Sequence, residues 1–191
     1  MCDTTQRDIN RKNPFFEPYN TPHDTVPFDR IALDDYEEAF MEGIRRDDEE
    51  IEKTVNNPEE PTFENTIVRI DNEKGNHYYD LLDRVSNVFS CMLSAETSDE
   101  LDELAQKMSP ILTKHSNDVR LNKRLFERIK YVYEHHRELT PEEKMLLDNC
   151  YDGFVRSGAL LNDEDKERLR TLTEEASMLS LQFSQNLLKE N

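Results

Sequence analysis

Histidine pairs are the first residues to test for chemistry, because a zinc hydrolase helix needs two histidines four positions apart, with a glutamate between them as base. The chain has five: His23, His77, His115, His135 and His136. None has a histidine four residues away, and the adjacent pair 135–136 would point about 100° apart on a helix. We expect that pair to lie on the surface near a helix C-terminus. His115 follows an apolar helical pattern and is expected to be a core or interface histidine with its hydrogen bonds satisfied.

The other chemical motifs are absent or incomplete. The acidic run Asp71–Gly75 places its glycine fifth rather than sixth, and Leu82 stands where a calcium loop needs a twelfth-position glutamate. There is no glycine-rich phosphate loop and no Gly-x-Ser-x-Gly elbow. Cys91 or Cys150 with a distant histidine could form a nucleophile pair, but no spacing supports it. The sequence therefore predicts no catalytic residue and no metal ligand in this chain, and leaves any substrate-binding residue unassigned.

The three cysteines are too few and too scattered for a disulfide framework. Cys91 and Cys150 fall among helical apolar positions and are expected to be small core residues. Cys2 lies in a polar tail directly after Met1. No apolar run of 18 residues or signal-type segment occurs, so no transmembrane segment and a cytoplasmic location are expected. A cell-envelope lipoprotein is the alternative if Cys2 is the first mature residue.

Acidic charge limits the range of partners. The formal net charge is −18, with 35% of residues charged. Nucleic acid is an unfavourable partner for such a surface, because phosphate binding needs clustered basic side chains, and an anionic membrane surface is equally unfavourable. Basic peptides or metal ions would be attracted. The simplest interpretation of the charge is a solvated acidic surface that aids solubility.

Helical periodicity dominates the chain, and low glycine content with no alternating apolar segment predicts an all-α fold. Residues 1–27 hold four prolines in fourteen residues and are expected to be extended, as a tail to about residue 12 and then packed on the body. The body, 28–191, is predicted to be an irregular antiparallel bundle of about six helices, several of them long.

Capping signals and apolar stripes place these helices. Thr62 is predicted to cap a helix that continues to about residue 92, with a weak or bent point at Gly75. Thr97 and Glu100 suggest a capping box for the next helix, which Pro110 should kink. The predicted helices span residues 34–56, 62–92, 97–119, 122–133, 140–157 and 162–188.

The last predicted helix begins at the cap Asn162, and acidic residues fill its first turn. Its apolar stripe has spacings of three and four and is expected to pack, in part against a partner outside this chain, contributing at most about 8–15 kcal/mol before entropy is subtracted. No stop signal follows it, so we expect a chain cut inside a longer protein. The stripe comprises Leu169, Leu172, Ala176, Leu179, Phe183 and Leu187.

Five ordered blocks carry a family resemblance over about residues 13–190. The chain resembles the N-terminal region of bacterial peptidyl-dipeptidases and oligopeptidases in the thimet-oligopeptidase-like family of zinc metallopeptidases. NNPEEPTFENTI and the FVRSGALL within the last block are the most specific. The blocks are NPFFEPYNTPHDTVPFDRI, DDYEEAFMEGI, NNPEEPTFENTI, LLDRVSNVFSCMLSAETSDELDELAQKMSPILTKHSND and YDGFVRSGALLNDEDKERLRTLTEEASMLSLQFSQNLL.

The resemblance implies a longer, almost wholly helical parent enzyme with a deep channel. In the family, a His-Glu-x-x-His helix and a later glutamate hold one zinc ion, and the parent would release C-terminal dipeptides from short peptides. None of that motif is present here, so no cofactor is expected in this chain, which should be inactive by itself. It would form a channel wall that limits access, with the missing catalytic half as its partner.

Two further expectations remain. Apolar surface meant for the missing half should be exposed, so the chain should tend to self-associate. The alternative function is a stand-alone acidic helical module that binds partner proteins through an apolar groove.

Overall fold

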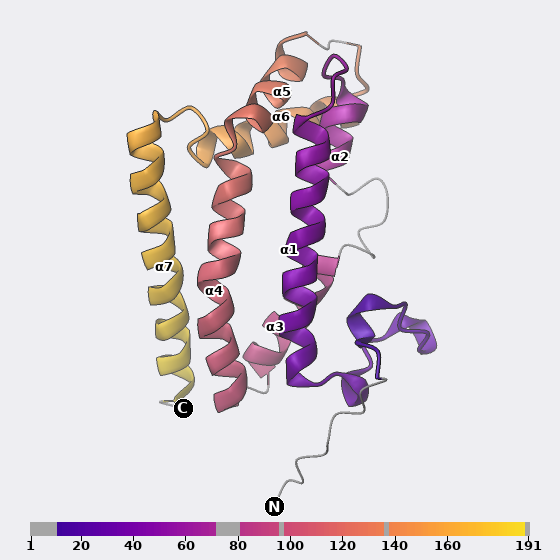
Figure 1. Ribbon diagram of the computed structural model, residues 1–191, viewed down its shortest axis with the longest axis vertical. Helices are drawn as coiled ribbons and strands as arrows, with labels where there is room; N and C mark the ends of the chain where they lie inside the picture. Colours follow the sequence, from indigo (N-terminus) through magenta and orange to yellow (C-terminus); the bar gives the residue numbers. More distant parts are fainter. Residues whose placement is uncertain (1–10, 72–80, 96–97, 136–137, 190–191) are drawn as a thin grey trace, which may run out of the picture.

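The computed structural model describes residues 11–71, 81–95, 98–135 and 138–189, and within these ranges the chain is helical with no β-strand (Figure 1). The all-α prediction is confirmed. Short 3₁₀ turns span Pro14–Phe16, Pro22–Asp24 and Phe28–Arg30, and a π-helical turn spans Phe63–Ile67. The α-helices are α1 (Leu33–Val55), α2 (Val68–Ile70), α3 (Leu81–Ala95), α4 (Asp99–Arg120), α5 (Lys123–His135), α6 (Pro141–Arg156) and α7 (Asp163–Lys189).

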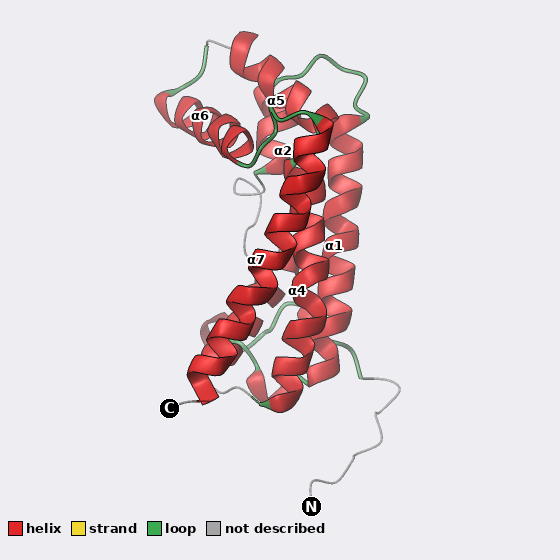
Figure 2. Ribbon diagram, turned by 90° about the vertical axis from the view of Figure 1, so that its left-hand side faces the viewer, coloured by secondary structure: helices red, strands yellow, loops and turns green. Residues whose placement is uncertain are grey.

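Three long helices set the shape. Figures 1 and 2 show α4 between α1 and α7, with α7 running antiparallel to α4 and α5 and α6 lying across one end. No helix in the described part of the chain combines the length and the apolar character needed to cross a bilayer.

Two hydrophobic clusters form the core, and α1 contributes to both. The cluster at the N-terminal end of α1 contains Tyr36 and Phe40, packed against α3 and α4. The cluster at its C-terminal end contains Ile51 and Val55, packed against the Phe63–Ile67 turn, α5 and α6. A single helix therefore joins two cores that have few other shared elements.

The N-terminal segment is fixed to the first cluster. Asn13 accepts a hydrogen bond from the Phe15 amide and donates one to the Asp35 carbonyl at 2.9 Å. Phe15 is fully buried, with its ring centroid 5.3 Å from that of Tyr36. Arg11 pairs with Asp35 through both carboxylate oxygens. The proline-rich segment is thus held by the buried Phe15 and Tyr19 rings, by apolar contacts of Phe16 and Val26, and by this polar clamp.

Most predicted helix starts are confirmed. The Asn122 and Asn162 side chains accept from the amides three residues on, and Thr140 forms a reciprocal capping box with Glu143. The start of α4 was predicted one residue too early: Ser98 is the observed cap, accepting from the Leu101 amide. Thr97 lies outside the described residues. α4 continues through Pro110, and the kink expected there stays a prediction.

The single helix predicted over 62–92 is wrong. Thr62 caps the Phe63–Ile67 turn as expected, but α2 ends at Ile70 and Asp71 has non-helical backbone angles (φ −91°, ψ 28°). Gly75 lies outside the described residues. Apolar periodicity failed here because it reports which side of each segment is buried, and this can stay in phase across a break in the backbone.

Of the six residues in the apolar stripe predicted for the last helix, all but Leu169 are exposed rather than packed within this chain, and packing against a partner stays a prediction. Leu169 is half-buried, whereas the exposed fractions are 51% for Leu172, 64% for Leu179, 69% for Phe183 and 53% for Leu187. Figure 2 views the bundle from the α7 side, where this helix is outermost. α7 instead turns a largely polar face toward α4, because α4 offers polar partners there. Those contacts are described below.

Gly43 allows α1 and α3 to come close together. A Cβ atom built on Gly43 would lie 2.9 Å from the Leu82 Cα, which is backbone and cannot move aside. By contrast, a Cβ on Gly153 in α6 would meet nothing within 4 Å. The two helical glycines therefore form a matched pair in which only one is required by packing.

We predict that Gly43→Ala destabilises the fold by about 1 kcal/mol, since overpacking of about 1–3 kcal/mol is partly offset by a helix-propensity gain of about 0.5–1 kcal/mol. Gly153→Ala, the control, should gain that propensity term alone and stabilise the fold. Urea unfolding of both variants measures this. Equal shifts for the two variants would contradict the close approach of α1 and α3.

Candidate functional site

His115 forms the most organised polar cluster between helices. α4 places it against α1, where its Nε2 lies 2.7 Å from Asp47 Oδ2 and its Nδ1 lies 3.1 Å from Asp48 Oδ1. The imidazole is 8% exposed. Hydrogen bonding to Asp47 raises its pKa above the ordinary value, and the Asp48 charge adds to this, although burial opposes it. The prediction of a satisfied interface histidine is confirmed.

A cavity of about 610 Å³ adjoins this cluster and also reaches α6. Its lining brings His115 and Cys150, the imagined nucleophile pair, to one cavity. Burial raises the pKa of the Cys150 thiol to about 11, the opposite of what an attacking thiolate needs. Both nitrogens of His115 already face carboxylates, so the ring is not available as a base for that thiol. The arrangement therefore does not support nucleophilic catalysis.

The other cysteine expected in the core is not there: Cys91 is exposed on α3. It falls outside the face of α3 that enters the first cluster through Leu81, Val85, Val88 and Phe89. The apolar face predicted for this helix is the buried one, but Cys91 lies beside that face rather than on it. Cys2 lies outside the described residues.

Within the described ranges, no group of three or more His, Cys, Asp or Glu side chains could hold a metal ion. His135 ends α5 as a structural residue, stacked on Tyr131 with ring centroids 4.2 Å apart and its Nδ1 2.9 Å from the Tyr131 carbonyl oxygen. His23 lies exposed in a 3₁₀ turn. His77 and His136 lie outside the described residues.

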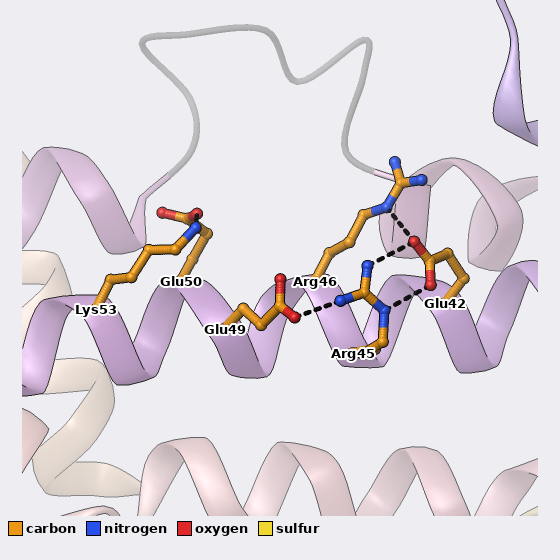
Figure 3. Close-up of polar contacts among 6 residues, drawn as sticks. All are labelled: Glu42, Arg45, Arg46, Glu49, Glu50 and Lys53. Atoms are coloured by element: carbon orange, nitrogen blue, oxygen red, sulfur yellow. Dashed lines mark hydrogen bonds and ion pairs between the residues drawn. The ribbon is translucent and has the colours of Figure 1, made fainter.

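The outer face of α1 carries a row of ion pairs (Figure 3). Glu42 accepts from Arg45 at 2.7 Å and from Arg46 at 2.8 Å, and these hydrogen bonds lower the Glu42 pKa to about 2. Arg45 also contacts Glu49, and Lys53 contacts Glu50. The basic side chains of this face are matched by neighbouring acids along one helix, so the face offers no concentrated positive charge to a ligand.

α7 is attached to α4 through a ladder of polar contacts. Arg170 pairs with Asp118 at 2.6 Å, and Asn117 donates to the Thr173 hydroxyl at 2.8 Å. Further along, Gln106 donates to the Gln185 side chain at 3.0 Å. Leu181 adds a partly buried apolar contact to the first cluster. The outward face of α7 holds Leu172, Ala176, Leu179 and Phe183, all exposed, and we call these four the α7 stripe.

The most specific sequence blocks have structural roles. In NNPEEPTFENTI, Thr62 and Asn65 cap the turn reciprocally, and Asn65 also accepts from Arg128 at 3.1 Å. In FVRSGALL, Gly158 adopts φ +94°, a conformation that favours glycine and lets the chain turn from α6 toward α7. These blocks encode turns and caps rather than reacting groups.

Comparison with known proteins confirms the resemblance expected from the sequence. The chain is 39% identical over 178 residues to dipeptidyl carboxypeptidase of Salmonella typhimurium strain LT2, a match that covers 92% of this chain and 25% of that protein. It is 37% identical over 181 residues to dipeptidyl carboxypeptidase of Escherichia coli K12, covering 94% of this chain and 26% of that protein. The matched part is the N-terminal region of these peptidases.

A weaker similarity extends to oligopeptidase A of Escherichia coli K12, at 25% identity over 181 residues, covering 92% of this chain and 25% of that protein. No protein-family profile matches the chain. The chain therefore spans about a quarter of the length of the curated relatives that it matches.

The His115 cluster generates a prediction about pH. Because the folded-state pKa of His115 is raised, protonation stabilises the fold below the ordinary histidine pKa, and this contribution is lost as the pH rises through the folded-state value. We expect the free energy of unfolding to decline over that interval, and the decline to weaken in Asp47→Asn. Urea unfolding at a series of pH values measures it.

Asp152→Asn, which alters an exposed carboxylate on α6, is the control and should leave the slope near wild type. If the free energy of unfolding of Asp47→Asn declined with pH as steeply as in wild type, the role given to the Asp47–His115 contact would be contradicted.

Proposed function

We propose that this chain is the N-terminal helical domain of a larger zinc peptidase that removes dipeptides from the C-termini of short peptides. The observation that carries the proposal is the 39% identity over 178 residues to a dipeptidyl carboxypeptidase, over 92% of the chain. Its greater similarity to the two dipeptidyl carboxypeptidases than to oligopeptidase A favours dipeptide release over general oligopeptide cleavage. In this proposal residues 28–191 form the helical domain and residues 1–27 a separate N-terminal segment, of which residues 1–10 lie outside the described part of the chain.

The chain's role in that enzyme is to form a wall of the substrate channel and to restrict entry to short, unfolded peptides. Three long helices side by side form a broad layer of the kind that can serve as a wall (Figure 1). The two most specific blocks of the resemblance contain caps and turns, which fits a domain selected for shape. Steric exclusion needs no reacting group in this chain.

Zinc would be held elsewhere in the parent. The described residues do not fit a zinc site, since no group of three potential ligands occurs among them. We therefore assign the zinc ligands and the water-activating glutamate to sequence beyond this chain, and expect the chain alone to be inactive. We further propose a cytoplasmic parent. Intact-mass measurement tests the lipoprotein alternative, since lipidation at Cys2 would add acyl mass.

A stand-alone protein-interaction module is the alternative, and the exposed α7 stripe is the observation that favours it. The gene separates the two. A His-Glu-x-x-His segment encoded downstream supports the peptidase, whereas a stop codon soon after Asn191 supports the module.

A chimera tests the proposed function. The matched quarter of the Salmonella dipeptidyl carboxypeptidase is replaced by this chain, and release of C-terminal dipeptides from an N-blocked short peptide is followed. We expect activity from the chimera, because the replaced region is 39% identical, and none from this chain alone with added zinc. A folded but inactive chimera would overturn the channel-wall assignment. Turnover by the chain alone would overturn the claim that the chemistry lies elsewhere.

Size selection is a separate readout of the same experiment. If the chain restricts entry, the chimera should cleave the short peptide but not the same sequence placed at the C-terminus of a folded carrier protein. The unmodified Salmonella enzyme is the control for both substrates. A gating role would be contradicted if the chimera cleaved the peptide and the carrier equally while the unmodified enzyme cleaved only the peptide.

A further inference from the structure

We infer that the α7 stripe is the docking surface for an apolar helix face in the remaining sequence of the parent peptidase. This inference rests on the proposed function. It specifies which surface of the domain joins the rest of the enzyme and what kind of surface it meets.

The first step is the orientation of α7. Its two faces are reversed relative to an ordinary surface helix: the face toward α4 makes the polar ladder, and the face toward solvent is apolar. Leu179 and Phe183 are 64% and 69% exposed. Leaving large apolar side chains in water forgoes the stabilisation that their burial would give. A contiguous apolar surface of this kind marks an interaction site in soluble proteins.

The second step is that α7 is fixed in this orientation. Rolling the helix to bury its stripe would break the Arg170–Asp118 pair and the Asn117–Thr173 hydrogen bond. It would also uncouple Gln185, which is 6% exposed and donates to the Asp102 carbonyl at 3.3 Å. Unpaired buried amides are costly. The polar ladder thus sets the register of α7 and presents its stripe outward.

The third step is the chemistry of the occupant. Spacings of four, three and four residues between Leu172, Ala176, Leu179 and Phe183 form the narrow seam of a two-helix contact. Ala176 lies within the seam, where a small side chain permits close approach of a second helix. The complementary surface is therefore an apolar helical stripe.

The source of that helix follows from charge and length. Self-association, which we expected from exposed apolar surface, would bring together two bodies of formal charge −18, and this repulsion makes a second copy the less favourable occupant. The curated relatives carry about three quarters of their length beyond the region matched here. The rest of the parent is covalently present at high effective concentration, so a modest seam suffices for docking.

Thiol labelling tests the inference without relying on activity. Phe183→Cys is introduced into this chain and into the Salmonella chimera, and alkylation at that position is timed by peptide mass spectrometry, which separates it from the native cysteines. We expect labelling to be slower by about tenfold or more in the chimera, because a docked side chain reacts only after local opening. Met145→Cys, at a residue 61% exposed on α6, is the matched control and should label equally fast in both proteins.

Equal labelling of Phe183→Cys in the chain and the chimera would overturn the inference. Protection that appears in the isolated chain and grows with its concentration would assign the stripe to a second copy and would also overturn it. If the chimera does not fold, the cysteine is placed at the aligned position of the intact Salmonella enzyme. Slow labelling there is expected, and labelling as fast as in the isolated chain would overturn the inference. A chimera that is protected but inactive would refute the proposed function while leaving the docking surface in place.

Discussion

The rest of the structure depends on the burial of α1, because each end of this helix packs into a different hydrophobic cluster. Tyr36 and Phe40 lie in one hydrophobic cluster, and Ile51 and Val55 lie in the other. Between them, Asp47 and Asp48 hold His115 of α4, so the middle of the helix is tied by polar contacts. Gly43 lets α3 approach at the backbone. These contacts together position α3, α4 and α5 around α1.

The polar groups at the interfaces orient helices, and none of those described is poised for catalysis. His115 has a carboxylate at each ring nitrogen, and the Cys150 thiol is held protonated by burial, so the cavity between them lacks both a free base and a thiolate. Caps of short helical turns are formed by the side chains of Asn13, Thr62 and Asn65. This division agrees with the proposed role as a channel wall, because a wall must be rigid and the reacting groups can be supplied by another part of the protein.

Local signals made much of the fold predictable from the sequence. Asn122, Thr140 and Asn162 begin helices because their side chains satisfy amides that lack partners within the helix, and this depends on only a few neighbouring residues. The site-level prediction for His115 was correct for a similar reason, since its helical phase was clear. The failures concern information that one segment does not contain. Asp71 breaks a helix whose apolar phase continues, and Cys91 lies just outside a buried face. The sequence assigned the stripe of α7 to packing, in part against a partner outside this chain, and could not say which of its residues this chain buries, because an apolar stripe does not identify the molecule that covers it.

The orientation of α7 shows that an apolar stripe on a helix need not be buried by its own chain. Periodicity correctly identified an apolar face, but it does not tell whether that face turns toward the chain's own core or away from it. α4 presents Asn117, which is 8% exposed, and the half-buried Asp118 to α7, and covered polar side chains of this kind need polar partners. If α7 turned its leucines toward α4, the buried Asn117 amide would lose its hydrogen-bond partner. The polar side of α7 therefore faces inward and its apolar side faces out. The reversed orientation is thus enforced by α4, and an exposed seam on α7 is its direct consequence.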